Sequence, residues 1–131
     1  SLEFSSTRVG RSNFCYTIIM SDLLLVYITC ESVEQAKIIG KHLMDKRLCA
    51  CVNIFPEMLP MFFWPPKENK IDESKEVVLI AKTTEGKYQE LEDEVHKAHT
   101  YDVPCVIAIP TAHVSKKYYD WLVGEINEPT K

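Results

Sequence analysis

The order of apolar segments predicts one α+β domain in which strands and helices follow each other as β-α-β-β-α-β. Two continuous apolar runs, residues 23–29 and 50–55, flank a segment with helical periodicity. A strand at residues 76–83 then precedes a second amphipathic segment and a further strand at residues 106–110. This order is that of a ferredoxin-like sandwich, in which one face of a four-stranded antiparallel sheet carries both helices.

The first helix is expected to begin at Ser32. Ser32 and Gln35 form a capping box, in which each side chain accepts a hydrogen bond from a free backbone amide. Apolar positions then recur at steps of three or four residues: Val33, Ala36, Ile39, Gly40 and Leu43. One stripe of this helix is therefore expected to cover the sheet.

A second helix and a closing C-terminal helix are expected to follow the same rule. Thr84 is the candidate cap of the second helix, and its acidic run from Glu90 to Glu94 is expected to face water. The predicted buried stripe of that helix is Tyr88, Leu91, Val95 and Ala98. Ser115 is the candidate cap of the closing helix, and the predicted buried side there is Tyr118, Trp121, Leu122 and Ile126.

The second strand is expected to pair in parallel with the first through a right-handed crossover and to continue into an extended hairpin. This hairpin carries an aromatic run at residues 62–64 and a turn at residues 65–69. The strands are apolar on both faces of the sheet, but the two helices can cover only one of these faces. The aromatic run of the hairpin adds further exposed apolar surface. The pattern therefore predicts an oligomer.

Size and composition limit the organisation and the partners. A chain of 131 residues, 46% of them apolar, suits a single domain, which we place at residues 22–131. Residues 1–21 lack apolar periodicity and are left as an N-terminal extension without a function. The apolar run at residues 23–30 is too short for a spanning helix, and 15 Lys and Arg against 19 Asp and Glu predict neither nucleic acid nor a membrane as partner.

Cysteine usage indicates the compartment. Five cysteines without a Cys-x-x-Cys pair do not form a secreted disulfide framework. A reducing, cytoplasmic location is therefore expected.

Three residues are candidate metal ligands. Cys51 follows Cys49 at strand spacing, which places two thiols on one face for a soft ion such as Cu(I), and Cys30 ends the first strand. Small core side chains are the alternative reading of these cysteines. His99 could ligate a metal through one ring nitrogen while Asp102 or a carbonyl oxygen orients the other, or it could simply favour the C-terminus of the second helix.

The other histidines, His42, His96 and His113, lack a second ligand at helical spacing and are expected at the surface. Four glycines spread along the chain cannot form a phosphate loop or a nucleophile elbow. Since no nucleophile with a partnered base is visible either, the chain is not expected to be an enzyme.

Several segments together resemble the CutA family of divalent-cation tolerance proteins over about residues 23–126. They are Arg47-Leu-Cys-Ala-Cys-Val-Asn53, Trp64, the stretch from Lys70-Ile71 through Lys82-Thr83, and His99-Thr-Tyr-Asp-Val-Pro104. The resemblance implies a ferredoxin-like subunit in a homotrimer built by extended hairpins, an association with copper and other divalent ions, and no established catalysis. The positions that match the family pattern are Cys30, Cys51, Asn53, Trp64, Lys82, His99, Tyr101 and Pro104.

The chain also departs from the family pattern. Phe62 stands for the motif tyrosine, and Pro65-Pro66 replaces the hairpin glycine, so the tip must close differently. Thr100 stands where the family pattern has a proline after the histidine, and Cys105 stands where it has an acidic residue after the second proline. Copper-linked bacterial members have a cysteine at the position of Ile28 and a second histidine at that of Ala98, so of that set only His99 is present.

Three functions remain open from the sequence. The first is a cytoplasmic homotrimer that binds copper or another divalent metal weakly through Cys30, Cys51 and His99. The second is a PII-like small-molecule-binding signalling trimer, by fold analogy alone. Its candidate pocket residues are Asn53, Trp64, Lys82, Tyr101, Asp102 and Pro104. The third is a scaffold for an unknown protein partner.

Overall fold

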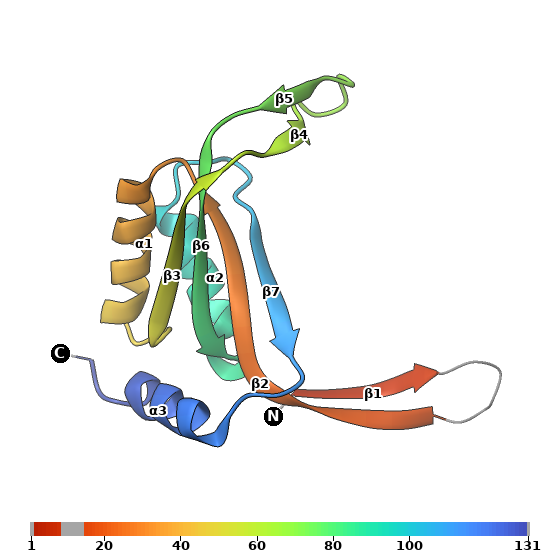
Figure 1. Ribbon diagram of the computed structural model, residues 1–131, viewed down its shortest axis with the longest axis vertical. Coiled ribbons are helices and arrows are strands. Elements are labelled where there is room, and N and C mark those ends of the chain that lie inside the picture. Colours follow the sequence, from red (N-terminus) through yellow and green to blue (C-terminus); the bar gives the residue numbers. More distant parts are fainter. Residues whose placement is uncertain (1, 9–14, 131) are drawn as a thin grey trace.

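The computed structural model describes residues 2–8 and 15–130, with side chains from residue 21 onward. Its elements are β1 (Leu2–Arg8), β2 (Cys15–Cys30), α1 (Val33–Asp45), β3 (Cys51–Met58), β4 (Met61–Phe63), β5 (Ile71–Glu73), β6 (Glu76–Thr84), the 3₁₀ turn η1 (Glu85–Lys87), α2 (Tyr88–Ala98), β7 (Val106–Thr111) and α3 (Lys116–Ile126). Figure 1 shows one sheet with α1 and α2 on one side of it. Among the described residues, no helix is long and apolar enough to cross a bilayer.

The main sheet has the strand order β7-β2-β6-β3, and every neighbouring pair is antiparallel. The predicted ferredoxin-like fold is confirmed. The predicted direct pairing of the first two strands is wrong, because β6 lies between β2 and β3. The crossover through α1 places β3 one strand position away from β2. The hairpin then returns the chain beside β3, so β6 fills the position between β2 and β3.

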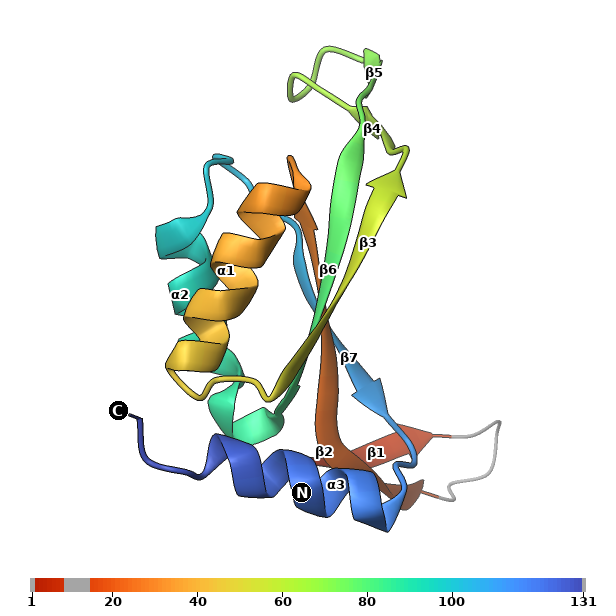
Figure 2. The same ribbon diagram turned by 60° about the vertical axis from the view of Figure 1, so that its left-hand side comes forward.

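The core lies between the sheet and the two helices (Figure 2). Alternate residues of the strands point into it, and the helical stripes close it from the other side. Its fully buried members include Val26, Ile28, Ile39, Leu43, Leu79, Ala81, Leu91 and Val95. Gly40 lets α1 approach the sheet, because a Cβ there would lie 3.2 Å from Val52 Cγ2.

Two of the three predicted helix caps are made. The Ser32 hydroxyl accepts from the Gln35 amide at 3.0 Å, and Gln35 Oε1 accepts from the Glu31 amide at 2.7 Å. Ser115 caps α3 by accepting from the Tyr118 amide at 3.3 Å. The predicted cap at Thr84 is wrong, because η1 comes first and the Thr84 side chain makes no capping hydrogen bond.

Helix α3 covers one end of the second face of the sheet. Leu122 and Ile126 are buried there against Leu23, on a stripe spaced by four residues. Trp121, predicted on the buried side, lies off this stripe and is 46% exposed, so that prediction is wrong. Arg47 holds the end of the helix, since its Nη1 donates to the Glu125 carbonyl oxygen at 3.0 Å.

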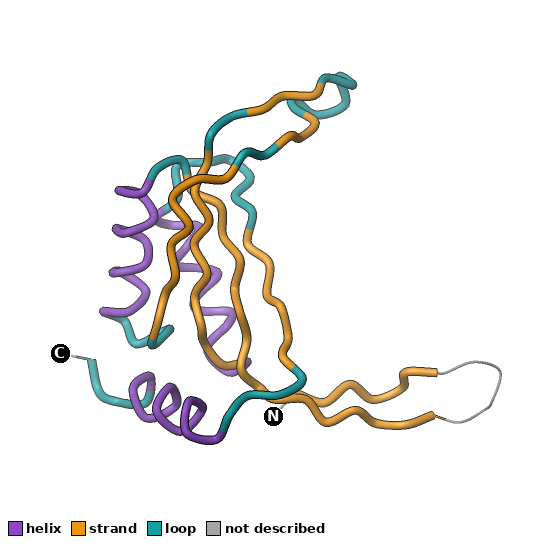
Figure 3. The backbone as a smooth tube through the Cα atoms, viewed as in Figure 1, coloured by secondary structure: helices purple, strands orange, loops and turns teal. Residues whose placement is uncertain are grey.

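Two antiparallel arms extend from the sheet away from the helices (Figures 1 and 3). The first pairs β1 with the start of β2, so β2 begins at Cys15, eight residues before the predicted strand. The second is the predicted hairpin, in which β4 pairs with β5 and Phe62 lies opposite Asp72. Between them lies the second face of the sheet, here called the open face.

The hairpin tip closes without a glycine, as the Pro65-Pro66 sequence required. The Trp64 amide donates to the Lys70 carbonyl oxygen at 3.0 Å, and the Trp64–Pro65 peptide is cis. Lys67 and Asn69 adopt positive φ angles of 64° and 56°, which turn the chain.

Glu94 is buried, although the sequence places it in an acidic run expected to face water. It is 6% exposed, and its carboxylate accepts from His42 Nε2 at 2.7 Å and from Lys97 Nζ at 2.9 Å. Lys46 Nζ lies 3.6 Å away. The hydrogen bond from His42, followed by that from Lys97, lowers the pKa of Glu94 to about 2.

We expect Glu94→Gln to reduce the stability of the protein at neutral pH and to matter progressively less in acid. The pKa of Glu94 falls from 4.5 to about 2 in the folded protein. Its contribution is therefore present above about pH 4.5 and is lost as the pH falls towards 2. Urea unfolding of both proteins across this range measures the difference. Glu90→Gln, at an exposed position of the same helix, is the control, and a Glu94→Gln effect that stayed constant with pH would contradict the prediction.

Candidate functional site

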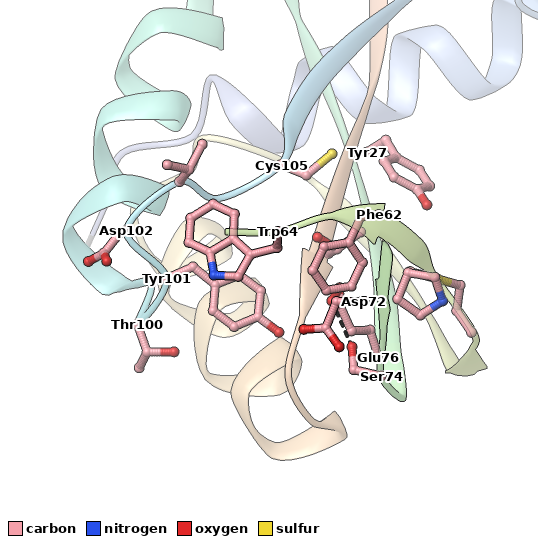
Figure 4. Close-up of a pocket in the computed structure, with 14 residues that line it drawn as sticks. Tyr27, Phe62, Trp64, Asp72, Ser74, Glu76, Thr100, Tyr101, Asp102 and Cys105 are labelled. Carbon is pink, nitrogen blue, oxygen red and sulfur yellow. Dashed lines mark hydrogen bonds between the residues drawn. The ribbon is translucent and has the colours of Figure 1, made fainter. Parts of the chain in front are cut away.

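A cleft of about 810 Å³ lies where the open face meets the hairpin arm and the loop between α2 and β7 (Figure 4). The sheet contributes residues of β2 and β6, the arm contributes both of its strands, and the loop contributes residues 100–103. The lining residues are Tyr27, Thr29, Met58, Pro60, Phe62, Trp64, Asp72, Ser74, Glu76, Thr100, Tyr101, Asp102, Val103 and Cys105.

Strand alternation decides which side chains reach the cleft. Val26 and Ile28 point into the core, so Tyr27 and Thr29 point to the open face. On β6, Val77 and Leu79 enter the core and Glu76 faces the cleft. Phe62 and Asp72 belong to the paired strands of the arm, which brings an aromatic ring and a carboxylate from ten residues apart to one wall.

The negative charge in the cleft centres on Glu76. Glu76 Oε2 accepts from the Ser74 hydroxyl at 3.5 Å (Figure 4). Burial raises the pKa of Tyr101 to about 12, and the charge of Glu76 is the second-largest cause of this rise. Burial and then the Glu76 charge also raise the pKa of Cys105, which lies directly before β7.

His99 connects the end of β2 to the loop that forms the cleft. Its Nδ1 accepts from the Tyr101 amide at 3.1 Å, and its Nε2 lies 2.7 Å from the Thr29 carbonyl oxygen. These partners require a proton on Nε2 and none on Nδ1. Both ring nitrogens are thus occupied, and His99 fixes the position of Tyr101 instead of presenting a free metal ligand.

The candidate thiol ligands do not come together within one subunit. Cys30 is fully buried on the helix side of β2. On β3, the side chains of Val52 and Ile54 enter the core, so strand alternation directs Cys51 to the open face. Cys30 lies opposite Val77 of β6 and Cys51 opposite Lys82, a separation of roughly 17 Å along the strand at 3.3 Å per residue.

We expect Cys30 and Cys49 to resist alkylation in the folded protein. Burial raises the pKa of Cys30 to about 11 and that of Cys49 to about 12, so the reactive thiolate is scarce at mildly alkaline pH. Iodoacetamide labelling followed by peptide mass spectrometry should modify both in urea and neither under native conditions. Native labelling of Cys30 at the rate seen in urea would contradict this packing.

The pocket residues predicted from the sequence divide into two groups. Trp64, Tyr101 and Asp102 line the cleft, and Pro104 lies in the same loop. Lys82 lies elsewhere, with its Nζ 5.4 Å from the centre of the Tyr118 ring near α3. Asn53 is exposed on β3, opposite Ile80.

Several residues of the cleft carry no signal in the sequence that would mark them as part of a site. Tyr27 and Thr29 belong to a strand that is apolar over most of its length, and their polar groups at alternate positions are the one signal that this face is accessible. The sequence does not distinguish Asp72, Ser74 and Glu76 from ordinary polar residues of a hairpin. Nothing in it shows that the hairpin arm and the sheet together form a cleft.

Comparisons with known proteins agree with this fold. The family model described as CutA1 divalent ion tolerance protein matches residues 24–125. A relative named divalent-cation tolerance protein CutA, from Archaeoglobus fulgidus, is 44% identical over 97 residues, which are 74% of this chain and 91% of the relative.

Solved structures give the same result. The periplasmic divalent cation tolerance protein CutA from Archaeoglobus fulgidus superposes with a TM-score of 0.76 at 39% identity, over 80% of this chain and 99% of that one. CutA1 from Oryza sativa also gives 0.76, at 34% identity, over 84% and 98% of the two chains. Sequence and structure therefore agree that the chain belongs to the CutA1 divalent ion tolerance family.

Proposed function

We propose that this chain acts as a non-catalytic, cytoplasmic homotrimer that binds divalent metal ions, copper among them, weakly. The observation that carries the proposal is the apolar open face, which lies between two arms and which α3 covers at one end only. The family's description as a divalent ion tolerance protein supports the metal part.

The open face has the properties of an interface between copies. Phe55, Ile107 and Ile109 point outward from its two edge strands and are 50%, 53% and 43% exposed. The hairpin arm adds Leu59, Met61, Phe63 and Ile71, each exposed by more than 60%. Exposed apolar surface of this extent beside free strand edges favours association with a second copy of the same face.

Metal binding through all three candidate ligands does not fit a single subunit. Cys30 lies on the other side of the sheet from Cys51, and both nitrogens of His99 have partners. Among the described residues, no group of three or more His, Cys, Asp or Glu side chains is placed to hold a metal ion. Cys51 is the candidate that assembly could complete, because its half-buried thiol faces outward where another subunit can add donors.

Anaerobic titration with Cu(I) and Cu(II) tests this proposal on the assembled protein. We expect Cys51→Ala to lower metal uptake and Cys30→Ala to leave it unchanged, since the Cys30 thiol is fully buried. Light scattering on the same samples confirms that each variant keeps its assembly. Equal uptake by the wild type and Cys51→Ala would contradict the metal assignment.

A further inference from the structure

We propose that copies of this chain meet head to tail, with the acidic end of one open face against the lysine end of the next. The inference rests on the proposed homotrimer and deepens it, because it assigns the polarity of the interface and the charged residues, Glu76 and Lys82, that join neighbouring copies. It follows from opposite charges that lie unpaired at the two ends of one face.

Strand β6 carries both charges on the same face of the sheet. Val77, Leu79 and Ala81 enter the core, so Glu76 and Lys82 at alternate positions belong to the open face. The step from residue 76 to residue 82 spans roughly 20 Å along a strand. Since this distance is too long for an ion pair, the two charges cannot neutralise each other within one chain.

The arm end of the open face is acidic. Asp72, Glu76 and Asp102 line the cleft there, and no Lys, Arg or His side chain does so among the described residues. Within the part of the chain whose side chains are described, none of these carboxylates forms an ion pair. When such a surface is buried by association, a cationic group on the partner is the favoured neighbour.

The opposite end of the open face, near α3, offers hydrogen-bond donors without an acceptor. Lys82 Nζ lies 5.4 Å from the centre of the Tyr118 ring and takes part in no ion pair with the described residues. The Tyr118 hydroxyl is the only buried side-chain polar atom, among the residues that the structure describes, without a hydrogen-bond partner. Arg47 is already paired with Glu125 at 3.3 Å. Lys82 is therefore the cation at this end that remains for a carboxylate of another chain.

A closed ring of three copies requires an interface with this kind of polarity. In a ring with threefold symmetry, each junction joins two different surface patches, one from each copy. Between the charged ends of the open face lie exposed apolar side chains such as Ile107 and Ile109. Joining unlike ends buries this apolar surface and brings Glu76 to Lys82, whereas joining like ends would bury carboxylate against carboxylate.

Carbodiimide treatment of the wild-type assembly tests this contact without changing a residue, because the reagent joins a lysine directly to a carboxylate that touches it. We expect peptide mass spectrometry to find Lys82 joined to Glu76, and a denaturing gel to show bands of two and three chains. This link can only join two copies, since roughly 20 Å separates the two residues within one chain.

Exchange of the two charges gives an independent measurement. Lys82→Glu and Glu76→Lys should each weaken association by about 100-fold or more, because each places like charges in contact. The double variant Lys82→Glu/Glu76→Lys restores unlike charges at every junction, so light scattering should return the mass of the wild type. Lys37→Glu makes the same change of charge at an exposed position on α1 and is the control.

A trimeric wild type without the Lys82–Glu76 link, or a double variant as dissociated as the single variants, would overturn this polarity and leave the proposed assembly intact. The same holds if both single variants remain trimeric. Equal dissociation by Lys37→Glu would also overturn it, because the effect would then come from net charge alone. A wild type that consists of single chains would overturn both the assembly and this inference.

Discussion

Ile107→Glu is expected to separate the assembly into single chains. Ile107 lies on edge strand β7 and is 53% exposed on the open face. In a single chain the new carboxylate would still reach water. In an assembly built on this face it would be buried beside apolar side chains, at a cost of about 3–5 kcal/mol. That cost weakens association by roughly 10²- to 10⁴-fold.

Ile38→Glu is the matched control. Ile38 is 67% exposed on α1, on the opposite side of the sheet, so the same substitution there should leave the mass unchanged. Light scattering after size exclusion measures both variants. An intact assembly in Ile107→Glu, or dissociation by Ile38→Glu alone, would place the interface elsewhere.

Leu79→Ala should lower the free energy of unfolding by about 2–5 kcal/mol. Leu79 is completely buried on the central strand β6, beneath α1, and lies between Ile28 and Ile54 in the strand register. Its removal leaves a cavity that the surrounding strands and helix cannot fill without moving. Urea unfolding at one fixed protein concentration measures the loss, because association also contributes to stability.

Ile38→Ala serves as the control for Leu79→Ala. Ile38 is 67% exposed on α1, on the side of the sheet away from the proposed interface, so we expect a change within about 0.5 kcal/mol. Losses of similar size in both variants would mean that Leu79 does not belong to the principal core.

The sequence predicted the fold well because the signals for it are local. The Ser32 cap, the helical stripes and the apolar strands each depend on residues near one another in the chain. The strand order could not be predicted from local signals, because the position of β6 between β2 and β3 depends on where the hairpin returns the chain to the sheet. Thr84 and Trp121 were misplaced because an extra 3₁₀ turn and the orientation of α3 depend on packing.

The site was harder to predict, since it depends on which residues meet. Glu94 reads as one of several acidic residues, and only its approach to His42 on α1 explains its burial. His99 resembles a metal ligand until the contacts with Thr29 and Tyr101 are known. Lys82 and Trp64 both match the family pattern, yet they lie at different ends of the open face.

The most direct test of the open face as an interface is the mass of the wild-type protein in solution. We predict that light scattering, over a range of protein concentrations, gives three times the chain mass of 15.1 kDa. A stable mass of one chain at all concentrations would contradict the proposed assembly.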